Sequence, residues 1–278
     1  MGKAKRTKFK VSHSKSYQKP GKVVPKPATS SGKSVKHKKP SKSAPPPAPT
    51  VPFSPTDHVL LVGEGDFSFS RSLVEAHGCS SLIATSFDMQ SALRGKYPQV
   101  ASHIRVLEED GCQVLYGVDA TKLGKPGTSD GGGKEVKRGW FDKVVFNFPH
   151  VGGLTKDVNR QARHNQGLLV GFFKSALPLM VAEGSIIVTL FEGEPYDLWN
   201  IRDLARHVGL KVERSFKFQA SAYPGYKHVR TLGNIEGGGG WKGEDRPART
   251  YIFKVNEKEA QPTPESKKKR GNSDSEDD

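Results

Sequence analysis

Residues 58–68 read HVLLVGEGDFS, a short apolar run that stops abruptly at two glycines. The run predicts a strand buried on both faces, and Gly63 and Gly65 allow a tight turn whose backbone a ligand can approach. In open α/β sheets, ligands bind where such turns leave the carboxyl ends of the strands. A dinucleotide fingerprint needs a third glycine where Ser68 stands, so NAD and FAD are disfavoured. An ordinary strand-to-helix turn is the alternative.

The same alternation of strand and helix patterns continues along the chain. Phe69, Leu73 and Ala76 share one helix face, and residues 160–181 predict a long apolar helix that Pro178 kinks near its end. Further strands are predicted at residues 82–87, 114–118, 141–148, 185–190, 210–218 and 250–255, and further helix faces at residues 100–107 and 201–208. Five strand–helix alternations predict a parallel sheet covered on both faces. The last two strands predict an antiparallel hairpin at one edge.

Charge divides the chain into three parts. Residues 1–56 hold 14 of the 44 Lys and Arg residues and no Asp or Glu, and residues 257–278 hold 5 basic and 7 acidic residues. Removing +14 and −2 from the net charge of +15 leaves +3 for residues 57–256. We therefore expect a disordered basic Lys/Pro-rich arm, one α/β domain and a disordered charged tail. The arm suits either a nucleic acid or a nuclear import receptor.

Composition excludes two other classes of protein. No stretch approaches the roughly 18–20 apolar residues that a membrane helix needs, so no membrane partner is expected. The two cysteines, Cys79 and Cys112, have no metal-binding or redox spacing. We therefore expect no metal and a reducing intracellular compartment.

Two acidic residues follow predicted strands at the edge that carries the Gly63 turn. Asp88 ends the second strand, where a carboxylate can accept hydrogen bonds from the ribose hydroxyls of a nucleoside, although a helix N-cap is the alternative. Asp119 ends the third strand in the same way, within reach of an adenine amino group. Three polar strand ends at one edge favour a nucleoside site.

The fourth predicted strand ends in Asn147-Phe148-Pro149-His150. This tetrapeptide resembles the Asn-Pro-Pro-Tyr motif of methyltransferases that act on planar nitrogens. Asn147 would grip the target nitrogen on a rigid turn, and Phe148 or His150 would stack on a flipped base. A simple Asn-containing turn with proline as a helix breaker is the alternative.

Aromatic and basic residues alternate in residues 223–230, YPGYKHVR, a pattern suited to stacking bases and pairing phosphates. A hairpin loop with solvated charges explains it equally well. Basic residues also begin the long helix, at the same expected edge. The candidate RNA contacts are Arg160, Arg163, His164, Tyr223, Tyr226, Lys227, His228 and Arg230.

Together these segments resemble the Rossmann-like domain of the eukaryotic 25S rRNA uridine-N3 methyltransferases. The resemblance covers about residues 58–255 and rests on LLVGEGDFSFS (60–70), ATSFD (84–88), GVDAT (117–121), FDKVVFNFPHVGG (141–153), HNQGLLVGFF (164–173), GSIIVTLFEGEPYDLW (184–199) and YPGYKHVRT (223–231). It implies S-adenosylmethionine as the methyl donor. It also implies the class I S-adenosylmethionine-dependent methyltransferase fold, a mostly parallel seven-stranded sheet with an antiparallel last strand.

The resemblance also assigns roles to residues. The implied donor-binding residues are Gly63, Glu64, Gly65, Asp66, Phe67, Ser68, Asp88, Asp119 and Ala120. The first four would line the methionine part, Asp88 would hold the ribose and Asp119 the adenine. The catalytic candidates are Asn147, Phe148, Pro149 and His150 around the target nitrogen, with Asp66 or His150 as a base.

The implied activity is methylation of N3 of a uridine in large-subunit rRNA, in the nucleus and nucleolus, with pre-ribosomal particles as partners and import receptors bound by the arm. Uridine N3 carries a proton with a pKa of about 9–10, in the range of tyrosine, which a base or water must remove. Two alternatives stay open: a non-catalytic RNA-binding or ribosome-assembly factor with this fold, and methylation of the exocyclic nitrogen of adenine.

Overall fold

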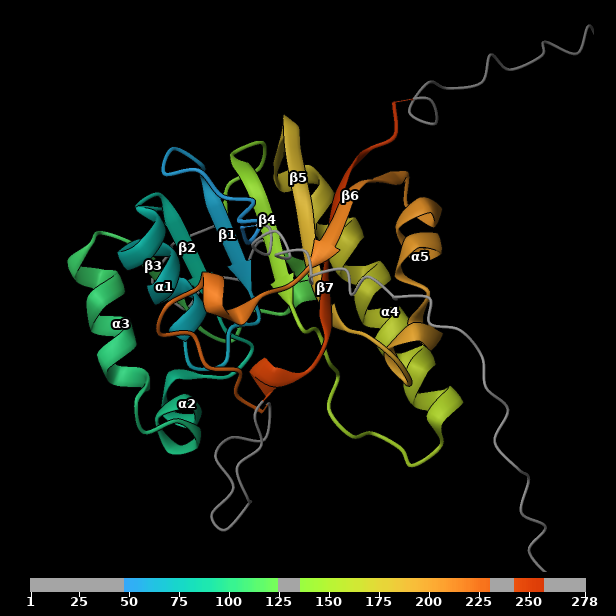
Figure 1. The fold of residues 1–278 in the computed structure, drawn as a ribbon, viewed down its shortest axis with the longest axis horizontal. Helices are drawn as coiled ribbons and strands as arrows, with labels where there is room; N and C mark the ends of the chain where they lie inside the picture. The colour runs from blue at the N-terminus through green and yellow to red at the C-terminus, as the bar shows by residue number, and fades with distance from the viewer. Residues whose placement is uncertain (1–47, 125–135, 231–242, 258–278) are drawn as a thin grey trace, which may run out of the picture. The chain divides into compact units, whose positions relative to one another are not determined.

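The computed structural model describes residues 48–124, 136–230 and 243–257. The predicted disorder of the charged tail and of all but the end of the basic arm therefore lies outside the described residues. So do most of the glycine-rich insertion at 128–139 and the GGGG sequence at 237–240. The described residues form a single seven-stranded sheet flanked by helices (Figure 1).

The strands follow the order β3-β2-β1-β4-β5-β7-β6 across the sheet. Their bounds are β1 Val59–Val62, β2 Leu82–Thr85, β3 Gln113–Leu115, β4 Phe141–Asn147, β5 Met180–Phe191, β6 Leu210–Lys217 and β7 Ala248–Val255. β1 to β5 pair in parallel, whereas β7 runs antiparallel to both of its neighbours. The predicted mostly parallel sheet with an antiparallel last strand is confirmed. The predicted terminal hairpin also forms, with β7 inserted between β5 and the edge strand β6.

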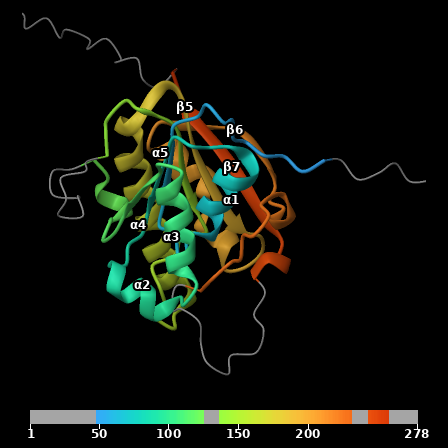
Figure 2. The ribbon, with the colours of Figure 1, turned by 90° about the vertical axis from the view of Figure 1, so that its left-hand side faces the viewer.

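The helices divide between the two faces of the sheet. They are α1 Ser68–His77, α2 Gln90–Lys96, α3 Val100–Glu109, α4 Val158–Ala176 and α5 Ile201–His207, with 3-10 turns η1 Ala120–Lys122, η2 Leu177–Leu179, η3 Tyr196–Trp199, η4 Ala220–Ala222 and η5 Gly243–Asp245. α1 and α3 pack together on one side, and α4 and α5 on the other (Figures 1 and 2). Among these described helices, none is long and apolar enough to cross a membrane.

Alternating side chains of the strands explain why both faces are covered. In β1, Leu60 and Val62 join the core beneath α4 and α5, whereas Val59 and Leu61 join the core beneath α1 and α3. All four side chains are at most 2% exposed. A strand buried on both faces needs the continuous apolar run that the sequence shows, and the sandwiched parallel sheet follows from it.

Three of the expectations about helices and strands need correction. The helix predicted for residues 160–181 ends at Ala176, because Pro178 lies in the short 3-10 turn η2 and Met180 already begins β5. Helix α2, Gln90–Lys96, was not predicted at all; Leu93 is its one buried residue, so no apolar periodicity marks it. The third strand, predicted at residues 114–118, spans Gln113–Leu115.

The packed part of the chain begins before residue 57. The Phe53 ring lies 6.2 Å from Phe69 and 6.5 Å from Tyr223, measured between ring centroids. Phe53 therefore packs against the core next to α1, although composition alone assigns it to the disordered arm.

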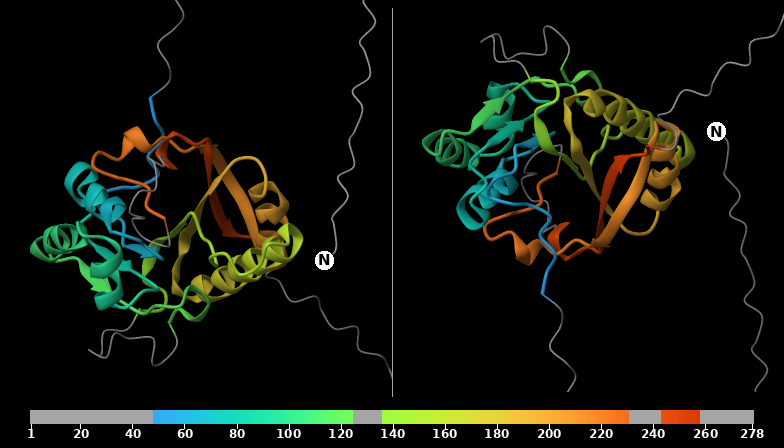
Figure 3. Two further views of the ribbon diagram at one scale, coloured as in Figure 1. Left: turned by 90° about the horizontal axis from the view of Figure 1, so that it is seen from below. Right: turned by 90° about the horizontal axis from the view of Figure 1, so that it is seen from above.

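The carboxyl ends of β1, β2 and β4 point to one edge of the sheet, the lower edge in Figure 1, and we call this edge the strand-end rim. Figure 3 (left) looks onto this rim from below and shows the described parts of the connection from β6 to β7, residues 218–230 and 243–247, at the same edge. The predicted site residues follow the ends of β1 to β4, lie in this connection or lie on the first turns of α4.

Candidate active site

The turn after β1 is built on two glycines with different neighbours. Gly63 has a φ of 71°, and a Cβ placed there would lie 2.5 Å from Cε2 of Phe146 in β4. A Cβ at Gly65 would lie 2.6 Å from Cγ2 of Val229 in the β6–β7 connection. Only glycine satisfies the left-handed backbone and the close approach at Gly63. At Gly65 the close neighbour is a side chain from the far end of the sequence.

Glu64 points into the protein from this turn. Its Oε2 accepts hydrogen bonds from the Ser70 hydroxyl, at 2.9 Å, and from the Ser70 backbone N–H, at 3.2 Å. Burial raises the pKa of Glu64 to about 7, against the lowering effect of these bonds and with a smaller raising effect from Asp66. The turn therefore holds a carboxyl group that titrates near neutral pH.

Asp66 and Phe67 fix the start of α1. Asp66 is 3% exposed; its Oδ1 accepts the Ser68 N–H at 3.0 Å and its Oδ2 accepts the Gln99 side-chain N–H at 2.9 Å. Phe67 has a φ of 62° and is fully buried. Both carboxylate oxygens of Asp66 thus already accept hydrogen bonds from the protein. This geometry does not favour the predicted role of Asp66 as a base.

Asp88 follows β2 and pairs with a lysine that the sequence did not single out. Both carboxylate oxygens lie 2.8 Å from Nζ of Lys96, at the end of α2. The N-cap of α2 is Met89 and it has no side-chain cap, so Asp88 does not play the capping role that was its alternative. Its neighbours Phe87 and Met89 are 72% and 61% exposed. A carboxylate between two exposed apolar side chains is a combination that suits a nucleoside.

Asp119 caps the 3-10 turn η1. Its Oδ1 accepts the Thr121 backbone N–H at 2.8 Å and hydroxyl at 2.7 Å, and Lys122 Nζ lies 3.0 Å from Oδ2. Burial acts to raise the pKa of Asp119, but these hydrogen bonds and the Lys122 charge hold it below its ordinary value. The next residue, Ala120, is 7% exposed.

Asn147 ends β4 and carries an unusual polar group. Its Nδ2 is buried and has no hydrogen-bond partner within the described ranges. The next residue, Phe148, has a φ of 51°, and its N–H donates to the Thr189 carbonyl at 2.8 Å. A left-handed phenylalanine and an unpaired buried amide are both costly, and such features concentrate at functional sites.

Phe148 and His150 diverge from this turn. The Phe148 ring packs 4.6 Å from Phe191 and 4.4 Å from His228, whereas the His150 ring lies 6.1 Å from Trp199 on the other side. Pro149, between them, is buried. Nδ1 of His150 accepts the Gly152 N–H at 2.8 Å, and burial lowers the pKa of His150. Neutral His150 therefore carries its proton on Nε2 and acts as a donor, so its predicted role as a base is not favoured.

The tyrosines of the β6–β7 connection belong mainly to the core. Tyr223 is 4% exposed and stacks on Phe218, with ring centroids 5.5 Å apart. The Tyr226 hydroxyl lies 2.9 Å from Nδ1 of His228. Burial, and then the nearby Arg246 charge, lower the pKa of His228 to about 4, so this imidazole is neutral at pH 7. A base-stacking role for Tyr223 finds no support in this packing.

The same connection is tied to the turn after β1. The Lys227 N–H and carbonyl both lie 3.2 Å from the Ser68 hydroxyl, and the Tyr97 hydroxyl donates to the Arg230 carbonyl at 2.6 Å. Lys227 itself is exposed. Three further predicted RNA contacts lie exposed on the first turns of α4: Arg160, Arg163 and His164.

Sequence reasoning missed the residues that brace the turn after β4. Asn165 accepts the Val151 N–H at 3.0 Å, and Gln161 Oε1 accepts the N–H groups of Leu154 and Thr155 at 3.1 and 3.2 Å. Their position in the first two turns of α4, directly after the turn, was the signal available in the sequence. Lys96 lies only eight residues from Asp88, but it was missed because helix α2, which brings the two side chains together, was not predicted. Trp199 was missed because its contact with His150 joins residues distant in the chain.

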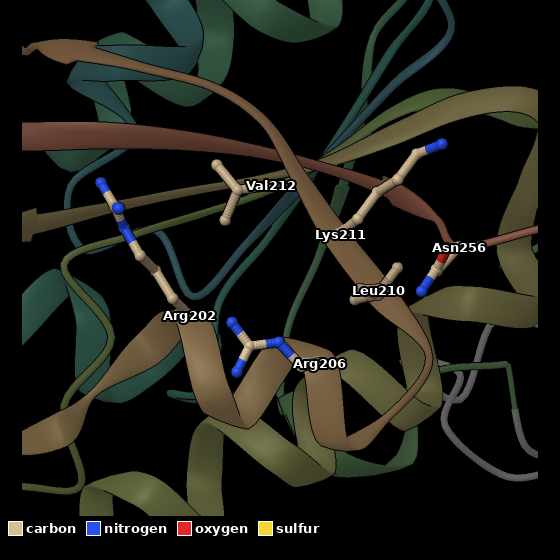
Figure 4. A pocket seen from close by; sticks show the side chains of 6 residues that line it. All are labelled: Arg202, Arg206, Leu210, Lys211, Val212 and Asn256. Atoms are coloured by element: carbon tan, nitrogen blue, oxygen red, sulfur yellow. The ribbon is translucent and has the colours of Figure 1, made fainter. Parts of the chain in front are cut away.

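One hollow in the surface lies away from the strand-end rim. It has a volume of about 360 Å³ and is lined by Arg202, Arg206, Leu210, Lys211, Val212 and Asn256 (Figure 4). Because Leu210 begins β6 and Asn256 follows β7, this hollow lies at the opposite end of the sheet. The described residues contain no cluster of three or more His, Cys, Asp or Glu side chains able to hold a metal ion, and both cysteines are buried free thiols.

The strand order, the reversed β7 and the glycine-containing turn after β1 define a class I methyltransferase fold. A family model described as rRNA (uridine-N3-)-methyltransferase BTM5-like, the BMT5-like family, matches residues 60–230. This match covers more than half of the chain, and the chain belongs to this family. The predicted family and fold class are confirmed.

Two curated proteins illustrate the range of relatives. The chain is 35% identical over 250 residues to the 25S rRNA (uridine(2634)-N(3))-methyltransferase of Saccharomyces cerevisiae, covering 73% of this chain and 74% of the yeast protein. It is 33% identical over 215 residues to the ferredoxin-fold anticodon-binding domain-containing protein 1 homolog of Mus musculus. That match covers 70% of this chain but 30% of the mouse protein, so the family's domain also occurs within longer chains.

Solved methyltransferase structures are similar to the chain only distantly. The Bacillus subtilis M1A22 tRNA methyltransferase TrmK is 11% identical, with a TM-score of 0.41 over 73% of this chain and 62% of that chain. The antibiotic-resistance methyltransferase Kmr is 14% identical, with a TM-score of 0.38 over 72% of this chain and 87% of that chain. Likenesses of this size carry no argument about function, which rests on the family and the site.

Proposed function

We propose that this protein transfers a methyl group from S-adenosylmethionine to N3 of a uridine in large-subunit rRNA. Two findings support this proposal: membership of the rRNA (uridine-N3-)-methyltransferase BTM5-like family and the similarity to the yeast enzyme across most of both chains. A fold of this kind hosts many methyl acceptors, so the choice of acceptor depends on the site.

The observation that carries the proposed target site is the unpaired Nδ2 of Asn147, which finds no partner in the described part of the chain. Leaving a buried donor unsatisfied costs about 1–3 kcal/mol, so a partner supplied by the substrate would recover that energy. In uracil, N3 lies between two carbonyl groups, and either oxygen can accept from an amide N–H. In adenine the ring nitrogens beside the amino group can accept in the same way, so Asn147 marks the place of the target base without choosing between the two bases. The family description and the yeast relative, which both name uridine N3, favour uridine over the adenine alternative.

The residues along the strand-end rim fit the methyl donor. Asp88, with exposed Phe87 and Met89 beside it, would hold the nucleoside, and the turn formed by residues 63–68 would hold the methionine part. Asp119 and Ala120 would lie along the adenine. The donor supplies an electrophilic methyl group. The contribution of the protein is then to place the uridine nitrogen in line with that group and to exclude competing orientations.

The proton on uridine N3 needs a destination. His150 is a donor through Nε2, and both carboxylate oxygens of Asp66 accept hydrogen bonds, one from Ser68 within the turn and one from the Gln99 side chain. Neither group is placed to take the proton, so we propose that it passes to solvent water. Positioning by Asn147, rather than acid–base chemistry by a side chain, then accounts for most of the rate.

The nuclear and nucleolar location is part of the same proposal. Residues 1–56 carry 14 Lys and Arg residues without a single acidic one, which suits both import receptors and the phosphates of pre-ribosomal RNA. All but the last few of these residues lie outside the described structure, so this part of the proposal rests on charge alone.

The direct test is nucleoside analysis. Purified protein and S-adenosylmethionine are incubated with large-subunit rRNA that lacks base methylation, and the digested nucleosides are identified by mass spectrometry. N3-methyluridine is the expected product. Methylated adenosine would favour the adenine alternative, and RNA binding without any methylated nucleoside would favour the assembly factor.

A further inference from the structure

A small pocket lies beside the turn after β4, on the side of that turn away from Phe148. It has a volume of about 120 Å³ and lies between the turn, the start of α4 and η3. Its lining includes His150, Thr155, Val158, Asn165, Pro195 and Trp199. Because His150 belongs to both the pocket and the Asn147–His150 turn, the pocket opens next to the proposed target site.

The wall of the pocket is held in place before any ligand binds. Asn165 is 1% exposed; its Oδ1 accepts the Val151 N–H and its Nδ2 donates to the Gln161 carbonyl at 3.0 Å. Gln161 in turn donates to the Gly152 carbonyl at 2.6 Å and accepts two N–H groups from the same loop. These bonds fix the loop of residues 151–155 against α4, so a ligand would meet a formed surface.

Each of the three elements around the pocket exposes an apolar side chain. Leu154 is 63% exposed, Val158 54% and Leu198 39%. They come from the loop after β4, from α4 and from η3, the three elements that enclose the pocket. These side chains offer apolar surface to a flat ligand that enters the pocket.

The exposed polar groups of the pocket include two donors. His150 offers Nε2–H, because its Nδ1 already accepts the Gly152 N–H, and Lys156 lines the pocket with an exposed ammonium. Trp199 is 1% exposed, and its indole Nε1 finds no partner in the described ranges. Arg160 and Arg163 follow on the exposed side of α4. Donors inside and cations outside suit a flat ring with a carbonyl edge that is attached to a phosphate chain.

We propose that this pocket holds an unstacked nucleobase with a carbonyl edge, from the nucleotide next to the target uridine. This inference rests on the proposed function, because it assumes that RNA lies across the strand-end rim. Its volume equals that of about four water molecules in the liquid, which is room for one ring but not for a nucleoside. The pocket would thus select RNA in which a neighbour of the target is also unstacked, and it would supply specificity beyond the target base.

Val158→Asp tests the pocket with little risk to the fold. Val158 is exposed at the first position of α4, where the helix dipole favours an acidic residue. Asn159→Asp is the matched control, since it adds the same charge to the same turn at an exposed residue outside the pocket. Val158→Ser is the second variant, which removes the apolar contact without adding charge. Circular dichroism and S-adenosylmethionine affinity of all three should match the wild type.

The substrate is a synthetic hairpin of the rRNA segment that the wild type methylates, together with copies in which one nucleotide flanking the target is abasic. Stacking of one base contributes about 1–3 kcal/mol, so Val158→Asp should lower kcat/KM on the intact hairpin by roughly tenfold to a hundredfold. Val158→Ser should lower it less, and Asn159→Asp should leave it unchanged. One abasic substitution should lower the wild-type value by a similar factor and should have no further effect on Val158→Asp.

Three results would overturn the inference. The first is unchanged kcat/KM in Val158→Asp, and the second is a further full loss on every abasic hairpin. The third is a fall in kcat for all hairpins alike, which would place the target base itself in the pocket. Failure of the wild type to methylate any RNA would instead count against the proposed function, so the two failures are distinguishable.

Discussion

Gly65, in the turn after β1, packs against Val229, in the connection between β6 and β7: a Cβ at Gly65 would lie 2.6 Å from Cγ2 of Val229. Hydrogen bonds between Ser68 and Lys227, and between Tyr97 and Arg230, hold the same two segments together. The turn expected to contact the methyl donor is therefore covered on one side by the segment expected to contact RNA. The expected donor site and the expected RNA site are therefore in direct contact.

This contact predicts a steric conflict that a second substitution relieves. Gly65→Ala should destabilise the protein by about 1–3 kcal/mol, because the added methyl overlaps Val229 while the backbone at residue 65 is not left-handed. Adding Val229→Ala should recover much of that loss, so the two substitutions should be strongly non-additive in urea unfolding. Additive costs would show that the turn and the connection are not in contact.

Glu64 predicts an unusual dependence of stability on pH. Its pKa is 4.5 in an ordinary setting and about 7 in the folded protein, so between these values the folded state keeps a proton that the unfolded chain has released. The contribution of this group to stability is therefore present below about pH 4.5, falls as the pH rises to about 7 and stays low above that.

Glu64→Gln removes this titration while keeping an oxygen that can accept from Ser70. The variant should match the wild type near pH 4 and be more stable by up to about 3 kcal/mol near pH 8, measured by urea unfolding at both values. The same stability difference at both pH values would contradict the raised pKa.

The Asp88–Lys96 pair predicts an asymmetric effect on donor binding. Asp88→Asn should weaken S-adenosylmethionine binding by about tenfold, because hydrogen bonds to a charged group contribute roughly 1.5–3 kcal/mol. Lys96→Met should have a smaller effect, since it removes the partner of the carboxylate but not the carboxylate itself.

The affinity for S-adenosylmethionine is measured by calorimetry, and Asp142→Asn is the control variant. Asp142 also pairs with a basic side chain, His58, but at the amino-terminal end of β4, away from the rim. Its substitution should leave donor affinity unchanged. Equal affinity of Asp88→Asn and the wild type would exclude Asp88 from the donor site.

The uneven distribution of charge predicts separate roles for the arm and the domain. Removing residues 1–50 takes away 14 positive charges and leaves the described residues almost whole. RNA affinity should fall and its dependence on salt concentration should become shallower, whereas S-adenosylmethionine affinity should not change. Binding titrations across a range of salt concentrations measure both slopes. Loss of donor binding in the truncated protein would show that the arm also serves the domain.

Much of the fold follows from local patterns. The run HVLLV and the other apolar segments predict all seven strands. The central strands have the continuous apolar signature of strands buried on both faces, whereas the edge strand β6 is mostly exposed or half-buried. Helix α2 was not predicted because Leu93 is its one buried residue. The length of α4 was overestimated because the residues after Pro178 continue as an equally apolar strand. Apolar runs alone do not separate a helix from a buried strand.

The site is less predictable than the fold. Sequence patterns placed Asn147, Asp88 and the Gly63 turn at strand ends, and the structure does bring these strand ends to one rim. They did not reveal that Lys96 pairs with Asp88, that the Gly152 N–H places the proton of His150 on Nε2, or that Tyr223 is buried in the core. The first two depend on local backbone geometry, in helix α2 and in the turn after β4, that the sequence patterns did not specify. The third depends on packing against residues distant in the chain.

The proposed target site depends most on Asn147, and a single-turnover methyl transfer assay with Asn147→Ala tests this assignment most directly. Enzyme in excess is mixed with labelled S-adenosylmethionine and unmethylated large-subunit rRNA, after donor affinity and stability are shown to be preserved. Removing an unpaired buried donor should leave stability equal or higher, while the rate of N3-methyluridine formation should fall by about a hundredfold to a thousandfold. A transfer rate equal to that of the wild type would contradict the assignment of Asn147 to the target uridine.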